Sequence, residues 1–533
     1  MSFKTGSQMG RHAFSTVTSA SFGIVTSVLL DAVVIALFGM GRQTDAYFIA
    51  VTIPTVIITI LLLQATRVVQ PVFMRKRRAE GEAAGWNYIN LIMTGGTAVV
   101  TAVCIIGALL SPLLIRVQAT GSPHDAVLLS TRLSVFLFFI LPLYFPIVVM
   151  RATLNSFDIF ALPGATKFFE NIFKILFVLL LGRKLGVQAL VLGMFAGALC
   201  QISSFYFVLK RKGFRYKPIF RLKHPDMIQA YSLIVFQLAG QLCGVGMEVV
   251  NNTLGSMLGA GNVSALRLAT RVIESFGGLL AGSIILAAMP TVAASAASGD
   301  REGTKKHLQH ALYLLLLVTV PLSVWLGLMH RPLIAFLYER ARFSAADTTL
   351  VAHLLLLMIP YIFLARWWGL LELPFFAEQN TRTPLVGILI TTTLYVIFSL
   401  LLVKGFGIYA IPIARSLAGL IGPCFLIYML RRRMGNLGFG AVRDSAMQIC
   451  AASLIMAVFM FLAIWLLPAL PPQGFGAKVL ALGLPSAIGA IALFMSLLIL
   501  GALSPSLLHR LPPYFGQWPS RLLDLAGYPK DPL

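Results

Sequence analysis

Of the 533 residues, 58% are hydrophobic and 11% are charged, whereas a soluble domain has roughly 25% charged residues, so the composition excludes a soluble protein. The formal net charge of +23 is compatible with nucleic acid, an anionic membrane or an acidic substrate as partner, and the positions of the charges decide among these. All five cysteines lie in apolar runs without a C-x-x-C partner, which argues against disulfides and against a metal site.

Apolar runs of about 20 residues, the length that crosses a ~30 Å hydrocarbon core, recur from one end of the chain to the other. Hydrocarbon offers the backbone no hydrogen-bond partner and the runs are too long for barrel strands, so each run predicts a helix. The first seven predicted spans are residues 14–38, 47–70, 88–115, 127–150, 161–181, 187–209 and 228–258. The second seven are residues 263–293, 308–329, 351–373, 384–403, 408–430, 445–469 and 479–503. The predicted fold is an all-α polytopic membrane protein with about fourteen transmembrane helices.

The longest polar break is basic and predicts the domain organisation. We predict an N-terminal lobe with helices 1 to 6, a basic cytoplasmic connection, a second lobe with helices 7 to 12, a pair of helices 13 and 14, and a cytoplasmic tail. In the same order, these are residues 1–209, 210–224, 225–435, 436–503 and 504–533.

The distribution of Lys and Arg predicts the orientation of the chain. If the N-terminus lies inside and the loops alternate, most loop Lys and Arg fall on inner segments, so both termini are predicted to be cytoplasmic. The basic residues then face anionic lipid head groups, and nothing further supports nucleic-acid binding. The polar, basic N-terminus and the long first apolar run do not resemble a cleavable signal peptide.

Ionisable side chains at membrane depth usually face a partner or a functional site. Arg267, Arg271 and Glu274 share one helical face, where two guanidinium groups suit a phosphate or carboxylate and Glu274 can orient Arg271. Snorkelling to an interface or an internal ion pair is the structural alternative.

A second charged face carries Lys167, Glu170 and Lys174, at spacings that allow ion pairs. Lys167 lies near the inner end of its span, so snorkelling explains it equally well.

Three polar residues of the seventh span, Glu248, Asn251 and Asn252, provide carboxylate and amide oxygens. Such oxygens suit a sodium ion or a proton relay, which makes these residues candidates for ion coupling. No catalytic, metal-binding or ATP-binding motif is present, so we expect no enzyme, no metal and no cofactor other than Na⁺ or H⁺ as coupling ion.

An ordered set of short motifs resembles the MviN/MurJ family of the multidrug/oligosaccharidyl-lipid/polysaccharide exporter superfamily. The matching segments are Phe38-Gly39 with Thr44 to Phe48, Leu154-Asn155 with Phe160, Pro163 and Asn171, Gly259 to Ser264 with Ala269 to Arg271 and Glu274, Met289-Pro290, Tyr338 to Asp347, and Phe376-Ala377 with Thr381 to Pro384. The resemblance covers roughly residues 30–435.

The resemblance implies a fourteen-helix transporter with two lobes around a central cavity, whose best-known members flip lipid II outward. It also carries the family's cavity arginine and glutamate over to Arg271 and Glu274, and its aspartates to Asp31 and Asp45. Lipid II flippases of the family carry arginines in the first two helices, and these would fall near the apolar residues Ile24, Leu30 and Ile58.

That departure predicts poor binding of the pyrophosphate of lipid II, unless Lys167, Lys174 or Arg415 supplies replacement charge. An exopolysaccharide repeat unit is therefore an equal candidate cargo.

We expect a MurJ-type flippase that moves a polyprenyl-pyrophosphate-linked saccharide across the bacterial inner membrane by alternating access, as a monomer. Asp45, Glu170 and Glu248 would line or gate the path of the head group. A cation-coupled multidrug antiporter of the same superfamily is the alternative, although the excess of Arg and Lys in the spans disfavours it. A membrane-embedded transferase would need a catalytic loop, and no loop is long enough to hold one.

Overall fold

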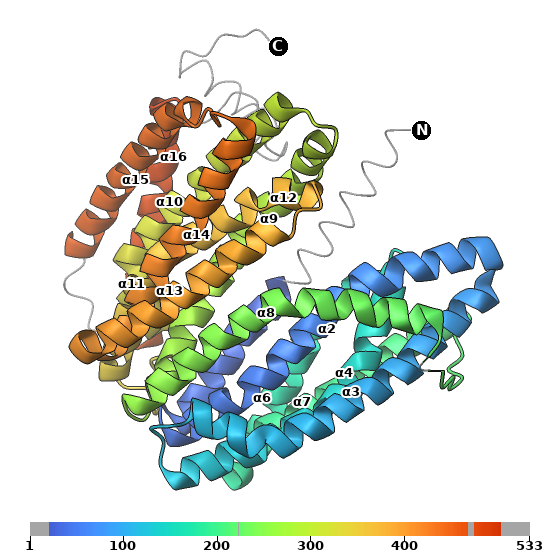
Figure 1. The fold of residues 1–533 in the computed structure, drawn as a ribbon. Helices are drawn as coiled ribbons and strands as arrows, with labels where there is room; N and C mark the ends of the chain where they lie inside the picture. The colour runs from blue at the N-terminus through green and yellow to red at the C-terminus, as the bar shows by residue number, and fades with distance from the viewer. Residues whose placement is uncertain (1–20, 222, 467–473, 503–533) are drawn as a thin grey trace. The chain divides into compact units, whose positions relative to one another are not determined.

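The computed structural model describes residues 21–221, 223–466 and 474–502, and all secondary structure in this part of the chain is helical (Figure 1). Packing contacts divide the chain into two compact units. The first unit contains a helix over Ser21–Phe38, here called helix 21–38, followed by α2 (Arg42–Glu80), α3 (Glu82–Gln118), α4 (His124–Asn155), α5 (Ala161–Gly164), α6 (Thr166–Leu185), α7 (Gln188–Arg211) and α8 (Pro225–Met257).

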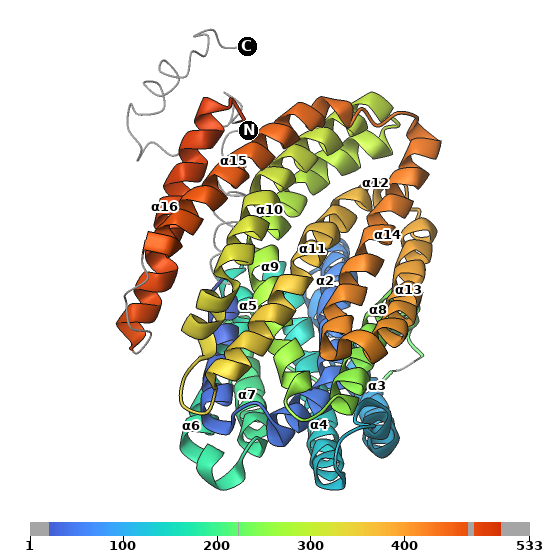
Figure 2. The ribbon, with the colours of Figure 1, turned by 90° about the vertical axis from the view of Figure 1, so that its left-hand side faces the viewer.

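Helix α9 (Asn262–Ala297) begins in the first unit and continues into the second after Arg271. The second unit contains most of α10 (Arg301–Tyr338) and α13 (Arg382–Phe406), together with α11 (Ala345–Leu371), α12 (Leu373–Ala377), α14 (Ala410–Met434), α15 (Gly440–Leu466) and α16 (Phe475–Ile499). A short 3-10 helix, η1 (Gly407–Tyr409), links α13 to α14, and α15 packs along α16 (Figure 2).

The prediction of a polytopic all-α membrane protein is confirmed, and every predicted span overlaps a helix. Ten helical stretches of the described part are long and apolar enough to cross a membrane, and one of them, Arg382–Met434, contains both α13 and α14. The predicted number of fourteen crossings and the predicted lobe boundaries stay predictions, because neither length nor packing establishes them. The predicted cytoplasmic tail, residues 504–533, lies outside the described residues.

A large apolar core holds the first unit together. Aromatic side chains such as Phe73, Phe138 and Phe205 are fully buried in it, and α2, α3, α4 and α7 pack around it. Burying one such side chain contributes about 1.5–3 kcal/mol relative to exposure to water, whereas inside a bilayer close packing has to supply the stability. The second unit has its own core around Leu312, Leu315 and Ile449.

The turn between helix 21–38 and α2 shows how the sequence positions a polar site. Gly39 adopts a φ of +75°, which favours glycine because it has no Cβ. The Gly41 backbone N–H donates to the Thr44 hydroxyl at 3.0 Å, satisfying one donor at the start of α2. Asp45 therefore lies in the first turn of α2, at a fixed point beside this turn.

Candidate functional site

Six charged side chains of the first unit lie within electrostatic range of one another, and we call them the charged group. Four are cations and two are carboxylates, so the group carries an excess of positive charge. Its members are Asp31 on helix 21–38, Lys167, Glu170 and Lys174 on α6, and Arg267 and Arg271 on α9.

Arg271 forms an ion pair with Asp31, not the local contact with Glu274 that its spacing suggested. The Arg271 Nε donates to Asp31 Oδ2 at 2.9 Å, and the Asp31 side chain is only 5% exposed while that of Arg271 is 23% exposed. Glu274 is exposed and belongs to the second unit. Asp31 therefore fixes the guanidinium in place while leaving part of it accessible.

Glu170 and Lys174 form an ion pair one helical turn apart on α6. Both side chains are largely buried, and each neutralises the charge of the other, which reduces the cost of burying them. Lys167, at the start of the same helix, is exposed and lies within electrostatic range of Glu170, but the close ion pair of Glu170 is with Lys174. The predicted charged face of α6 thus consists of a neutral buried pair and one accessible cation.

Asp45, which the resemblance implied as a cavity residue, is hydrogen-bonded to the start of α9. Its buried carboxylate accepts hydrogen bonds from the Gly261 N–H at 2.6 Å, from the Ser264 N–H at 2.8 Å and from the Ser264 hydroxyl at 2.5 Å. These donors lie at the start of α9, where a helix leaves its first N–H groups unsatisfied. Asp45 therefore caps α9 and ties it to α2, which is a positioning role.

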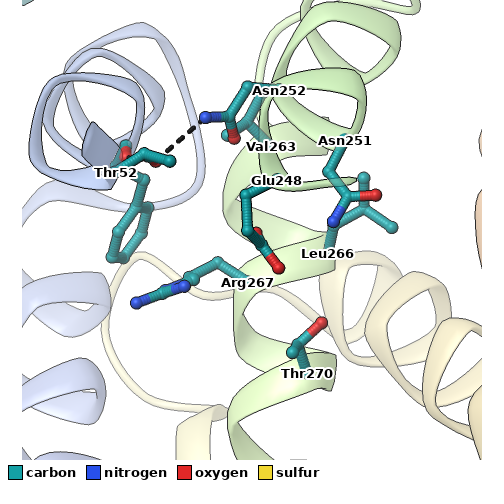
Figure 3. Close-up of a pocket in the computed structure, with 9 residues that line it drawn as sticks. Thr52, Glu248, Asn251, Asn252, Val263, Leu266, Arg267 and Thr270 are labelled. Carbon is teal, nitrogen blue, oxygen red and sulfur yellow. Dashed lines mark hydrogen bonds between the residues drawn. The ribbon is translucent and has the colours of Figure 1, made fainter. Parts of the chain in front are cut away.

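The candidate ion-coupling residues line a small cavity in the first unit (Figure 3). Glu248, Asn251 and Asn252 from α8 face Arg267 and Thr270 from α9 across it. Its volume of about 10 Å³ is the room that one water molecule or one bare ion needs, so no saccharide or phosphate fits. The cavity joins the charged group at Arg267.

Asn252 has a structural task in this cavity wall. Its amide N–H₂ donates to the Thr52 hydroxyl and to the Gln118 side-chain oxygen, both at 2.9 Å. These bonds link α8 to α2 and α3. Asn252 therefore helps to hold the wall of the cavity together.

Arg415, a predicted binding residue, belongs to the second unit, where its guanidinium lies over the Tyr361 ring at 4.5 Å. Leu30 and Ile58 lie in the apolar core of the first unit. Cations at these two core positions would be buried among apolar side chains.

Sequence reasoning missed three tyrosines that surround the charged group. Tyr144 lies near Glu170, Tyr338 lies near Asp31 and Arg271, and Tyr47 lies near Lys174, and all three are almost completely buried. The available signal was a hydroxyl within an apolar run, because a buried tyrosine usually needs a polar neighbour.

The chain is similar to proteins of one membrane-transport family. The family model "Lipid II flippase MurJ" matches residues 34–484. A probable lipid II flippase MurJ from Buchnera aphidicola subsp. Acyrthosiphon pisum (strain APS) is 24% identical over 505 residues, covering 91% of this chain and 95% of that protein. Lipid II flippase MurJ from Thermosipho africanus (strain TCF52B) is 23% identical over 414 residues, covering 77% of this chain and 83% of that protein.

Solved structures show the same fold. A structure of lipid II flippase MurJ in an inward closed conformation has a TM-score of 0.74 at 21% identity and covers 91% of this chain and 97% of that chain. An inward-facing multidrug resistance transporter of the MATE family has a TM-score of 0.60 at 13% identity, covering 79% of this chain and 95% of that chain. Both likenesses concern the fold alone.

Proposed function

Because this chain belongs to the MurJ family of lipid II flippases, we propose that it moves a polyprenyl-pyrophosphate-linked saccharide from the cytoplasmic to the periplasmic leaflet of the bacterial inner membrane. The observation that supports this most directly is the charged group, in which Asp31 holds Arg271 in place within an excess of cations. The reaction is movement by alternating access, with no covalent step and no cofactor chemistry.

The charge of the group matches the charge of such a cargo. Arginine and lysine in a water-poor setting bind pyrophosphate through charge-assisted hydrogen bonds, and a pyrophosphate diester carries two negative charges. The cost of leaving an uncompensated cation inside the membrane makes an anionic ligand favourable there. A cationic drug would be repelled by the same residues, which disfavours the multidrug antiporter.

Lipid II is the first candidate cargo. The expectation that lipid II is not carried depended on apolar residues at Ile24, Leu30 and Ile58. That reasoning weakens because Lys167 on α6 lies within electrostatic range of Arg271 and supplies a cation near the site. An exopolysaccharide repeat unit shares the pyrophosphate and is the other cargo of this chemical class.

The cavity beside Arg267 is our candidate site for a coupling ion. Glu248 and Asn251 offer the oxygen ligands, and the volume admits one ion. The positive charge of Arg267 in the same wall weakens cation binding, so we propose occupancy by a sodium ion or proton that is weak and reversible, as coupling requires.

Anionic lipid is the expected partner of the segment between α7 and α8. Exposed Arg215, Lys217 and Arg221 line it together with exposed Tyr216 and Phe220, the composition of an interfacial segment beside anionic head groups. We propose that the protein works as a monomer, with this segment and both termini on the cytoplasmic side.

A strain depleted of its own lipid II flippase tests the cargo. We expect growth when this chain is expressed and lysis when it carries Arg271→Ala at equal membrane abundance. Lysis with the unaltered chain, together with loss of an exported polysaccharide when the native host loses the protein, would transfer the proposal to that polysaccharide.

A further inference from the structure

Helix 21–38 and α6 run parallel in a fixed register. A Cβ added to Gly23 would approach the Cβ of Lys167 to 2.9 Å, and one added to Gly182 would approach the Phe38 ring to 3.2 Å. Between these points, Asn171 Nδ2 donates to the Ser27 hydroxyl at 2.8 Å. Lys167 therefore lies level with Gly23, and both helices run in the same direction from this point.

The register gives the charged group a depth order. Asp31 lies eight residues beyond Gly23, which is about 12 Å along the helix. The Asp31–Arg271 pair is therefore about 12 Å from the level of Lys167 along this axis. Helix α9 begins beside Asp45 and Met40 and reaches Asp31 at Arg271, so it runs antiparallel to helix 21–38. Arg267 is then about 6 Å further toward the Phe38 end.

The cations at the two ends of this order are the ones for which the described part of the chain shows no close ion pair. Glu170 pairs with Lys174 and Asp31 pairs with Arg271, whereas Lys167 and Arg267 form no ion pair with any described residue. Lys167 also lies in the first turn of α6, where the positive end of the helix dipole disfavours a lysine and favours an anion beside it. Both terminal cations are thus placed to gain from an anionic ligand.

We propose that Lys167, Arg271 and Arg267 form a ladder of three cationic steps for a pyrophosphate head group, with Lys167 as the residue that captures it. This inference rests on the proposed function, and with a cytoplasmic N-terminus Lys167 is the step nearest the cytoplasm. The steps are about 6–12 Å apart, and the lysine and arginine side chains are long and flexible. One phosphate group of the pyrophosphate can therefore contact the next cation while the second phosphate group is still bound to the previous cation, as in multi-site conduction. Asp31, which is paired with Arg271, keeps this middle step from trapping the anion.

The test is binding of undecaprenyl pyrophosphate to purified full-length protein in detergent, with uncharged undecaprenol as the reference lipid. Lys167→Gln should weaken binding about tenfold or more, since a charge-assisted hydrogen bond contributes roughly 1.5–3 kcal/mol. Lys167→Arg should retain most of the affinity. Lys184→Gln, which removes an exposed lysine from the far end of α6, is the matched control and should bind normally.

Each outcome separates the ladder from the proposed function. Normal binding by Lys167→Gln, with normal thermal stability, would show that Lys167 only snorkels to the interface and would overturn the ladder alone. If Lys167→Gln unfolds, Lys167→Arg serves as the test. Failure of a folded Lys167→Arg variant to bind undecaprenyl pyrophosphate would then overturn the ladder. Equal binding of undecaprenyl pyrophosphate and undecaprenol by the unaltered protein would contradict the cargo class and with it the proposed function.

Discussion

Among single residues, the charge available to a ligand depends on which carboxylate neutralises which cation. Spacing along α9 suggested that Glu274 orients Arg271, but the partner found is Asp31, 240 positions away in the sequence. Local spacing can reveal a charged helical face, whereas it carries no information about a helix packed across from it. The resemblance to the family, not the periodicity, pointed to Asp31.

The Asp31–Arg271 pair should behave as one unit in a double-mutant cycle. Asp31→Ala leaves a partly buried guanidinium without its carboxylate, a change that costs about 3–5 kcal/mol. We expect the variant with both Asp31→Ala and Arg271→Ala to be more stable than Asp31→Ala alone, measured as thermal unfolding in detergent. Additive losses from the two substitutions would show that the residues do not interact.

Ion coupling can be tested at Glu248, which shares the small cavity with Arg267. Glu248→Gln keeps the size of the side chain and removes its charge, so export should become independent of external sodium and pH. The measurement is the rate of lipid export in cells at varied sodium concentration and pH. A dependence equal to that of the unaltered protein would place the coupling site elsewhere.

At the scale of helices, the position of α6 depends on close packing by small residues. Gly193 and Gly197 on α7 face α6 at Lys174 and Glu170, a spacing of four that lets two membrane helices approach closely. The apolar runs predicted both helices correctly. Their register could not be predicted, because hydrophobic length does not specify which faces meet.

Replacing Gly193 by alanine should destabilise the protein. The added Cβ would lie 2.6 Å from the Lys174 Cα, so the backbones of α6 and α7 must separate. Gly244→Ala is the control, since nothing lies within 4 Å of its added Cβ and alanine favours helix by up to about 1 kcal/mol. The midpoint of thermal unfolding in detergent should fall for Gly193→Ala and not for Gly244→Ala. Equal midpoints for the two variants would contradict the packing of α7 on α6.

For the whole molecule, composition and hydropathy were sufficient for the membrane class, and every predicted span overlaps a helix, but they did not predict the short helices α5 and α12. They were not sufficient for the role of Asp45, because a buried carboxylate that caps α9 looks the same in sequence as one that faces a substrate. The sequence placed Arg415 in the second lobe, but it did not predict the cation–π contact with Tyr361.

The orientation of the chain has a direct test in the connection between α7 and α8. The excess of Lys and Arg there predicts that it lies in the cytoplasm. Lys217 is exposed, so Lys217→Cys should resist an impermeant maleimide in intact cells and react after the membrane is opened. The native cysteines need replacement beforehand, and labelling from outside would reverse the assigned topology.

The proposed function requires that this chain moves lipid II outward by means of the cations around Arg271. The most direct measurement is the fraction of lipid II that an added periplasmic enzyme can cleave in intact cells depleted of their own flippase. We predict a high cleaved fraction with the unaltered chain, a background fraction with Arg271→Ala and an intermediate one with Arg271→Lys. A background fraction with the unaltered chain, at normal membrane abundance, would contradict lipid II as its cargo.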